Sequence, residues 1–277
     1  MAAITKAYAA IAEGQLHLRC RNTESDKLPL VLLHASPASS RSLEPLMAQI
    51  GKRNPLYAFD TPGTGQSCMP AQSQPMMEDY ANILSRGASA IGVDRVALYG
   101  THTGAHIAIE WALAERSRVA ALVLDGVALF DDLTRREFLE VYAPPQEPDP
   151  SGAQFHWAWN YIRDQMIFFP HYKKDLAHLR AGGTFDPGTL HQLTLEVLNN
   201  LRTYHQPYEA VFRHEVRDAL SRIAVPVLIL SDAEGPLQDT EDELRQLMPK
   251  AQLARNCHGW NEKAAAITKF LVEIENG

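Results

Sequence analysis

The chain has 277 residues, a length that suits one α/β domain carrying an insertion. Its content of 45% hydrophobic and 21% charged residues is typical of a globular protein and argues against disorder. With 26 Lys and Arg against 33 Asp and Glu, the formal net charge is −7, which argues against a nucleic-acid-binding protein. The cysteines Cys20, Cys68 and Cys257 are too few and too far apart for a disulfide framework or a paired zinc site.

The N-terminal segment 1–14 is alanine-rich but lacks the layout of a signal peptide, because Lys6 and Glu13 interrupt it. The longest apolar runs fall far short of the roughly 20 residues that span a bilayer. We therefore expect a cytoplasmic protein that has no membrane partner.

Short apolar runs alternate with segments of helical spacing. Runs that are apolar throughout are typical of strands in a parallel sheet covered on both faces, and the alternation predicts right-handed crossovers and a doubly wound sheet. The expected strands are Leu30–Leu33, Leu56–Phe59, Val96–Tyr99, Ala121–Leu124 and Val227–Leu230. The expected helices are Ser42–Arg53, Met77–Ile91, Ala105–Ala114, Glu241–Met248 and Lys263–Glu275.

The alternation stops between residues 131 and 220, where a proline-rich stretch precedes aromatic segments of helical character. We predict that residues 131–220 form a helical cap inserted into an α/β core of residues 1–130 and 221–277. Such an insertion is expected over the C-terminal ends of the strands, where open α/β sheets bind ligands.

The segment Gly100-Thr101-His102-Thr103-Gly104 lies between an expected strand and an expected helix. Small residues around one central side chain are what a nucleophile elbow requires, since the turn is sharp and presents that side chain to a pocket. The backbone N–H of Thr103, at the start of the helix, is then a candidate oxyanion donor.

Three further motifs accompany this turn in order along the chain. They are Leu33-His34-Ala35-Ser36-Pro37, Asp60-Thr61-Pro62-Gly63-Thr64-Gly65-Gln66-Ser67 and Asn256-Cys257-His258-Gly259-Trp260. Together the four segments resemble the α/β-hydrolase superfamily over nearly the whole chain. The resemblance implies the α/β-hydrolase fold, a mostly parallel doubly wound sheet with an inserted helical cap, and no cofactor. It also implies an oxyanion hole formed by the N–H groups of Ser36 and Thr103, with His34 in a structural role.

The chain departs from the family at the elbow, where His102 replaces the usual Ser, Cys or Asp. An imidazole at this position would form a labile acyl-imidazole or act as a general base. A buried histidine in a relative that only binds a ligand is the alternative. The resemblance places the family's catalytic histidine at His258, and we expect the side chains of His102 and His258 to converge on one pocket under the cap.

The chain also departs from the family at the position of the catalytic acid, where it has no carboxylate. Counting along the family pattern reaches Gly235, and Glu234 or Asp232 could substitute only if the loop re-aims them. Some relatives carry the acid after the preceding strand, where this chain has Asp125, and we favour Asp125 over Glu234 as the partner that orients His258.

Within the expected cap, Trp159 and Arg163 are candidate substrate-binding residues, because an arginine there can clamp a carboxylate. An ion pair of Arg163 with Asp164 or Glu196 is the simpler alternative. We expect no metal site, since His102 and His106 are four residues apart but His102 belongs to the turn.

These features predict an enzyme, nominally a hydrolase of a small apolar or aromatic ester, thioester or C–C-bonded keto compound, with His102 as an unusual nucleophile or general base. A cofactor-independent lyase or isomerase that uses His102 for proton transfer stays open, as does a non-catalytic ligand-binding protein. The expected partner is a small-molecule substrate, with a homodimer left open and no nucleic acid or membrane.

Overall fold

The computed structural model describes residues 3–180, 185–231 and 240–276. Its centre is an eight-stranded sheet of order β1-β2-β4-β3-β5-β6-β7-β8. The strands are β1 (Thr5–Ile11), β2 (Gly14–Arg21), β3 (Leu30–Leu33), β4 (Leu56–Phe59), β5 (Val96–Thr101), β6 (Val119–Asp125), β7 (Val227–Leu230) and β8 (Gln252–Ala254). All neighbouring strands from β4 to β8 pair in parallel, whereas β2 pairs antiparallel with β1 and β4, so the expected mostly parallel sheet is confirmed.

The five strands expected from apolar runs are all present, but the sequence reading missed the hairpin of β1 and β2 and the short strand β8. β1 is rich in alanine and mostly exposed, so it lacks the continuous apolar run by which the central strands were recognised. β8 has only three residues, none of them buried. β2 does contribute Leu16, Leu18 and Cys20 to the core, but polar residues alternate with them, so it also lacks a continuous apolar run.

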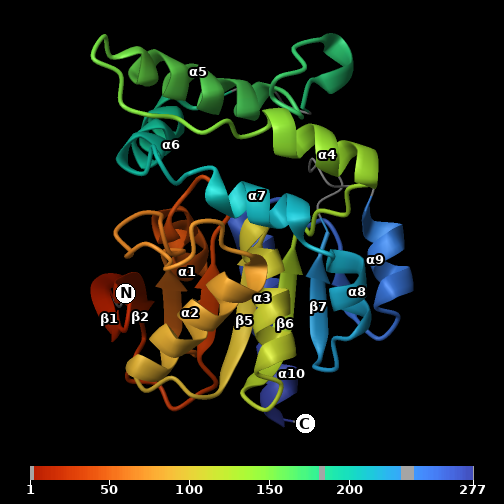
Figure 1. Cartoon of the computed structure of the whole chain (residues 1–277). Coiled ribbons are helices and arrows are strands. Elements are labelled where there is room, and N and C mark those ends of the chain that lie inside the picture. The colour runs from red at the N-terminus through yellow and green to blue at the C-terminus, as the bar shows by residue number, and fades with distance from the viewer. Residues whose placement is uncertain (1–2, 181–184, 232–239, 277) are drawn as a thin grey trace.

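Helices cover both faces of the sheet (Figure 1). The expected helix at residues 42–53 is instead a 3-10 turn, Ser40–Leu43, followed by a short helix that begins at Glu44 and has Pro45 in its first turn. One face of the sheet carries α1 (Glu44–Gln49) and α10 (Trp260–Asn276). The other face carries α2 (Met77–Ala90) and α3 (Thr103–Ala114). On this second face, α9 (Glu241–Leu247) lies near the edge of the sheet.

Between β6 and β7 the described chain is helical, and we call residues 131–220 the inserted segment. Its helices are α4 (Asp132–Val141), α5 (Ala153–Ile167), α6 (Pro187–Asn199), α7 (Gln206–Arg213) and α8 (Val216–Ser221). Figure 1 shows α4, α5 and α6 beyond the end of the sheet, with α7 between them and the strands. Phe138 on α4 packs against the rings of Phe130, Phe169 and Phe212, which ties this segment to the core. None of the described helices is long and apolar enough to cross a membrane.

Candidate active site

His102 occupies the apex of the turn between β5 and α3. Its backbone has φ 48° and ψ −112°, and its N–H donates a hydrogen bond of 2.9 Å to the carbonyl oxygen of Asp125. The helix approaches β3 so closely that a Cβ at Gly104 would lie 2.1 Å from the carbonyl oxygen of Leu33. The expected strand, sharp turn and helix are therefore confirmed, with His102 at the position where such turns expose a side chain.

The imidazole of His102 lies against Gly126, the residue after β6. A Cβ at Gly126 would be 2.9 Å from Cε1 and 3.0 Å from Nδ1 of the ring. Any larger residue would displace the imidazole, so Gly126 makes the space that a histidine at the elbow needs.

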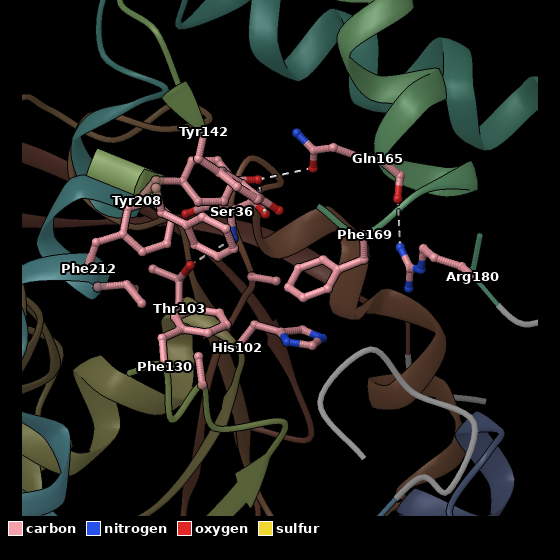
Figure 2. Close-up of a pocket in the computed structure, with 14 residues that line it drawn as sticks. Ser36, His102, Thr103, Phe130, Tyr142, Gln165, Phe169, Arg180, Tyr208 and Phe212 are labelled. Atoms are coloured by element: carbon pink, nitrogen blue, oxygen red, sulfur yellow. Dashed lines mark hydrogen bonds between the residues drawn. The ribbon is translucent and has the colours of Figure 1, made fainter. Parts of the chain in front are cut away.

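His102 borders two hollows. The inner cavity has a volume of about 170 Å³, and six of its lining residues are aromatic: Phe130, Phe138, Tyr142, Phe169, Tyr208 and Phe212. A wider outer groove is bordered by Asp125, Trp260 and Lys263. The two hollows share Ala35, Ser36, His102, Gln165 and Arg180 as lining residues. Figure 2 shows the His102 imidazole directed toward the side of the inner cavity where Phe169 and Arg180 lie.

The surroundings of His102 favour its neutral form. Burial lowers the pKa of His102, and the positive charges of Lys263 and Arg180 lower it further, while the Asp125 carboxylate acts in the opposite direction. A neutral imidazole at neutral pH can accept a proton, which is the requirement for a general base.

Asp125 lies at the end of β6 beside His102 and is buried. The hydroxyl of Tyr99 donates a 2.6 Å hydrogen bond to its Oδ2, and the Nζ of Lys263 lies 2.8 and 3.0 Å from its two oxygens. Burial and the Asp125 charge hold the pKa of Tyr99 well above its usual value, so this hydroxyl keeps its proton. The expected pairing of Asp125 with His258 is thus replaced by a pairing with Lys263.

His258 does not join this group. It is exposed in the loop between β8 and α10 and lines neither hollow, so the expected convergence of two imidazoles on one pocket is not found. The helix that follows turns Trp260 and Lys263 toward the groove instead. The other acid considered from the sequence, Glu234, and its neighbours Asp232 and Gly235 lie outside the described residues.

The expected oxyanion groups lie at the inner cavity. His34 is buried, and its Nδ1 and Nε2 contact the Ala35 carbonyl oxygen at 2.8 Å and the Thr61 N–H at 3.0 Å, bonds that suit a structural role. The N–H of Ser36, however, already donates to the hydroxyl oxygen of Thr103 at 3.3 Å (Figure 2). The backbone N–H of Thr103 belongs to the first turn of α3, where amides have no partner within the helix.

The two candidates from the inserted segment are placed differently from the expectation. Arg163 is bound to its neighbour Asp164, with 2.7 Å between Nη2 and Oδ1, so the simpler alternative of an ion pair is the one found. Trp159 is 38% exposed and lines neither hollow. The face of α5 that borders the outer groove carries Ile162, Gln165 and Met166 instead.

Arg180 takes the position that the sequence reading gave to Arg163. Its Nη1 donates a 2.8 Å hydrogen bond to the Gln165 carbonyl oxygen, and it borders both hollows. The ion pairs of the described residues leave Arg180 without a carboxylate partner. A guanidinium held in this way can bind a carboxylate with two hydrogen bonds.

The sequence reading missed both Lys263 and Arg180. The sequence did contain a signal for Lys263. It lies in the first turn of α10, where the helix dipole disfavours a positive charge. A lysine at such a position indicates an acidic partner elsewhere in the fold. Arg180 follows no recognisable pattern, because the fold alone brings it near the elbow.

Among the residues that the structure describes, no group of three or more His, Cys, Asp or Glu side chains is arranged to hold a metal ion. The described residues supply an imidazole, a buried ion pair, an arginine and the hydrogen-bond donors of residues 36 and 103 to the site.

Parts of the chain are similar in sequence to known proteins. A 2-hydroxy-6-oxononadienedioate/2-hydroxy-6-oxononatrienedioate hydrolase of Dechloromonas aromatica (strain RCB) is 36% identical over 133 residues, which are 45% of this chain and 45% of that protein. A 1-acylglycerol-3-phosphate O-acyltransferase of Sus scrofa is 29% identical over 110 residues, 39% of this chain and 32% of that protein. The matched parts are thus less than half the length of these relatives.

The similarity of fold extends further than that of sequence. A crystal structure of a membrane phospholipase A superposes with a TM-score of 0.72 over 99% of this chain and 87% of that chain, at 20% identity. The sequence profile of the Alpha/beta hydrolase family matches residues 30–273, which is most of the chain. This protein therefore belongs to the alpha/beta hydrolase family.

Proposed function

We propose that the protein is a cofactor-independent hydrolase in which neutral His102 acts as a general base on water. The observation that carries this proposal is the placement of His102: the elbow turn aims a partly buried imidazole with a lowered pKa at both hollows. Such a group is suited to proton transfer, and its place is the one from which this fold presents its reactive side chain.

The reaction can be written without a covalent intermediate. His102 takes a proton from a water molecule, whose oxygen forms a bond to the substrate carbonyl carbon, and the carbonyl oxygen takes the negative charge. When the bond to the leaving group breaks, the imidazolium returns the proton to that group. Lys263, held by Asp125, keeps a positive charge near His102 that favours the neutral imidazole before the reaction.

The substrate class follows from the walls of the site. The aromatic inner cavity suits a small apolar or aromatic group, and Arg180 offers a binding group for a carboxylate at the boundary of the two hollows. We infer that the inserted segment acts as a cap that selects such substrates, namely acidic esters, thioesters or keto acids cleaved at a C–C bond. The name of the matched Dechloromonas aromatica protein, which describes a keto dioate hydrolase, supports the last of these.

The test is hydrolysis of a panel of aryl esters, aryl thioesters and 2-hydroxy-6-keto dienoic acids. Removal of a general base typically costs about 10²- to 10⁴-fold in rate, so His102→Ala should lower kcat by that factor, and His102→Ser should not restore the native reaction. His156→Ala, at an exposed position on α5, is the matched control and should leave kcat unchanged.

Three outcomes would contradict the proposal. An acyl group found on His102 by rapid quenching and mass spectrometry would make the imidazole a nucleophile. A loss smaller than about tenfold in His102→Ala would remove His102 from the chemistry. A product that is an isomer or an elimination product, without uptake of water oxygen, would favour the lyase or isomerase alternative.

A further inference from the structure

The hydroxyl of Thr103 stands between the Ser36 amide and the inner cavity. The Ser36 N–H donates to Thr103 Oγ1 at 3.3 Å, and both residues line that cavity (Figure 2). A substrate oxygen that approached the Ser36 N–H directly would have to displace this hydroxyl. The oxyanion donor at this position is therefore not the free backbone amide that the sequence led us to expect.

The Thr103 hydroxyl retains a proton that it can donate. A hydroxyl has one donor and two acceptor positions, and the bond from Ser36 uses one acceptor position only. Among the described residues, the structure gives this proton no acceptor. Thr103 is only 5% exposed, so the nearest space for an acceptor is the cavity that the residue lines.

The bond from Ser36 also strengthens Thr103 as a donor. A hydroxyl that accepts a hydrogen bond is polarised and donates more strongly, since hydrogen bonds in a chain reinforce one another at low dielectric. The Thr103 backbone N–H, unpaired within the first turn of α3, is a second donor on the same residue. One oxygen in the cavity can thus be bound by two groups of Thr103.

We propose that the Thr103 hydroxyl, polarised by the Ser36 N–H, is the side-chain donor to the oxygen that becomes negatively charged in the reaction. This inference rests on the proposed hydrolytic function for its kinetic test. It assigns a catalytic role to the side chain of Thr103, whereas the sequence predicted such a role only for the backbone N–H of this residue.

The kinetic test compares three substitutions. Loss of one oxyanion donor typically costs about 10²- to 10³-fold in kcat, so Thr103→Val, which keeps the shape and removes the hydroxyl, should show such a loss with little change in KM. Thr103→Ser keeps the hydroxyl and should retain kcat within about threefold, and Thr103→Ala should lose at least about tenfold. Thr194→Val, which removes an equally buried hydroxyl on α6 that lines neither hollow, is the control.

A binding test separates this inference from the proposed function. The probe is 4-nitrophenolate, an aromatic oxyanion, titrated into each variant at a pH at which it is ionised. Thr103→Val should weaken its binding by about tenfold or more, as expected for a lost charge-assisted hydrogen bond, and Thr103→Ser should not. If the wild-type protein binds the phenolate in this hydroxyl-dependent way but hydrolyses nothing in the panel, the donor role holds and the hydrolytic function fails.

The inference is overturned by any of three results. Activity in Thr103→Ala that equals or exceeds the wild type would mean that the side chain merely blocks the Ser36 amide. Equal losses in Thr103→Ser and Thr103→Val would point to the methyl group rather than the hydroxyl. A wild-type protein that does not bind the phenolate would have no oxyanion site at Thr103.

Discussion

At the scale of single residues, His102 is supported by groups that come from three other parts of the chain. Gly126 leaves room for the ring, and the charges of Lys263 and Arg180 lower the pKa of the imidazole. The residue itself has φ 48°, a conformation that costs a non-glycine residue about 1 to 3 kcal/mol and that tends to persist at functional sites. A histidine retained at such a cost fits a chemical role better than a packing role.

Arg180 is expected to decide the preference for acidic substrates. Because a hydrogen-bonded charge contributes about 1.5 to 3 kcal/mol, Arg180→Met should raise KM for carboxylate-bearing substrates by about 10- to 100-fold. Neutral esters of the same size should be unaffected. The measurement is steady-state hydrolysis of matched acidic and neutral substrates.

Arg163→Met is the matched control, since Arg163 is also in the inserted segment but is bound to Asp164. It should leave KM unchanged for both kinds of substrate. A loss that is equal for acidic and neutral substrates in Arg180→Met would show that Arg180 only supports the Gln165 backbone, to which it is hydrogen-bonded.

Some residues of the candidate site could be predicted from the sequence and others could not. His102 and Asp125 could be identified because each directly follows or ends an apolar strand, and strand ends of a parallel sheet converge at one edge. The partner of Asp125 could not, because His258 and Lys263 are both near the start of the last helix, and only the rotation of α10 decides which side chain reaches the carboxylate.

At the scale of elements, the turn after β6 and the elbow after β5 depend on each other. Gly126→Ala would place a Cβ 2.9 Å from the His102 ring and should shift the imidazole by several tenths of an ångström or more. Misplacement of a reacting group by about 1 Å can cost about 10²-fold in rate, so kcat should fall strongly while the protein remains folded. Kinetics and urea unfolding of the same preparation provide the measurement.

Gly92→Ala is the control that separates the effect of backbone strain from the effect of displacing the His102 imidazole. Gly92 has φ +76°, as Gly126 does, but no atom lies within 4 Å of the place where its Cβ would be. Both substitutions should lower the free energy of unfolding by about 1 to 2 kcal/mol because of the left-handed backbone, yet only Gly126→Ala should lower kcat. Full activity in Gly126→Ala would mean that the position of the imidazole is unimportant.

At the scale of the whole molecule, a buried chain of polar groups joins α3 to the inserted segment. The Ala128 N–H donates to Nε2 of His106 at 3.3 Å, so the proton of His106 is on Nδ1 and is donated to Nδ1 of His214 at 2.8 Å. The Nε2–H of His214 then donates to Glu110 at 2.7 Å. This arrangement requires that His106 be neutral, and burial holds its pKa well below the usual value.

Stability should therefore fall on acidification. The unfolded chain takes up protons on histidines below about pH 6.5, whereas His106, and to a smaller extent His34 and His102, resist protonation in the folded state because of burial. Stability is thus full above about pH 6.5 and is lost as the pH falls toward the lowered folded-state pKa values, by about 1.4 kcal/mol per pH unit for each such histidine. Urea unfolding at about pH 7.5 and about pH 5.5 measures the difference.

His106→Phe should reduce this pH dependence even though it also lowers stability at neutral pH, because one neutral histidine is removed from the folded state. His156→Phe, at an exposed position, should leave the pH dependence as it is in the wild type. An unfolding free energy that stays constant between the two pH values would contradict a neutral His106.

The sequence by itself determined the parallel sheet and the elbow at His102, because strands buried on both faces need apolar runs and a sharp strand-to-helix turn needs small neighbours. Only the tertiary structure decided that Asp125 is paired with Lys263, that Arg180 rather than Arg163 borders the cavity, and that the Ser36 amide is bound to the hydroxyl of Thr103. The two hydrogen-bonded pairs are 138 and 67 positions apart in the chain, and Arg180 is 78 positions from His102. Their formation depends on how helices rotate and pack over the sheet, and no local pattern of residues encodes that rotation.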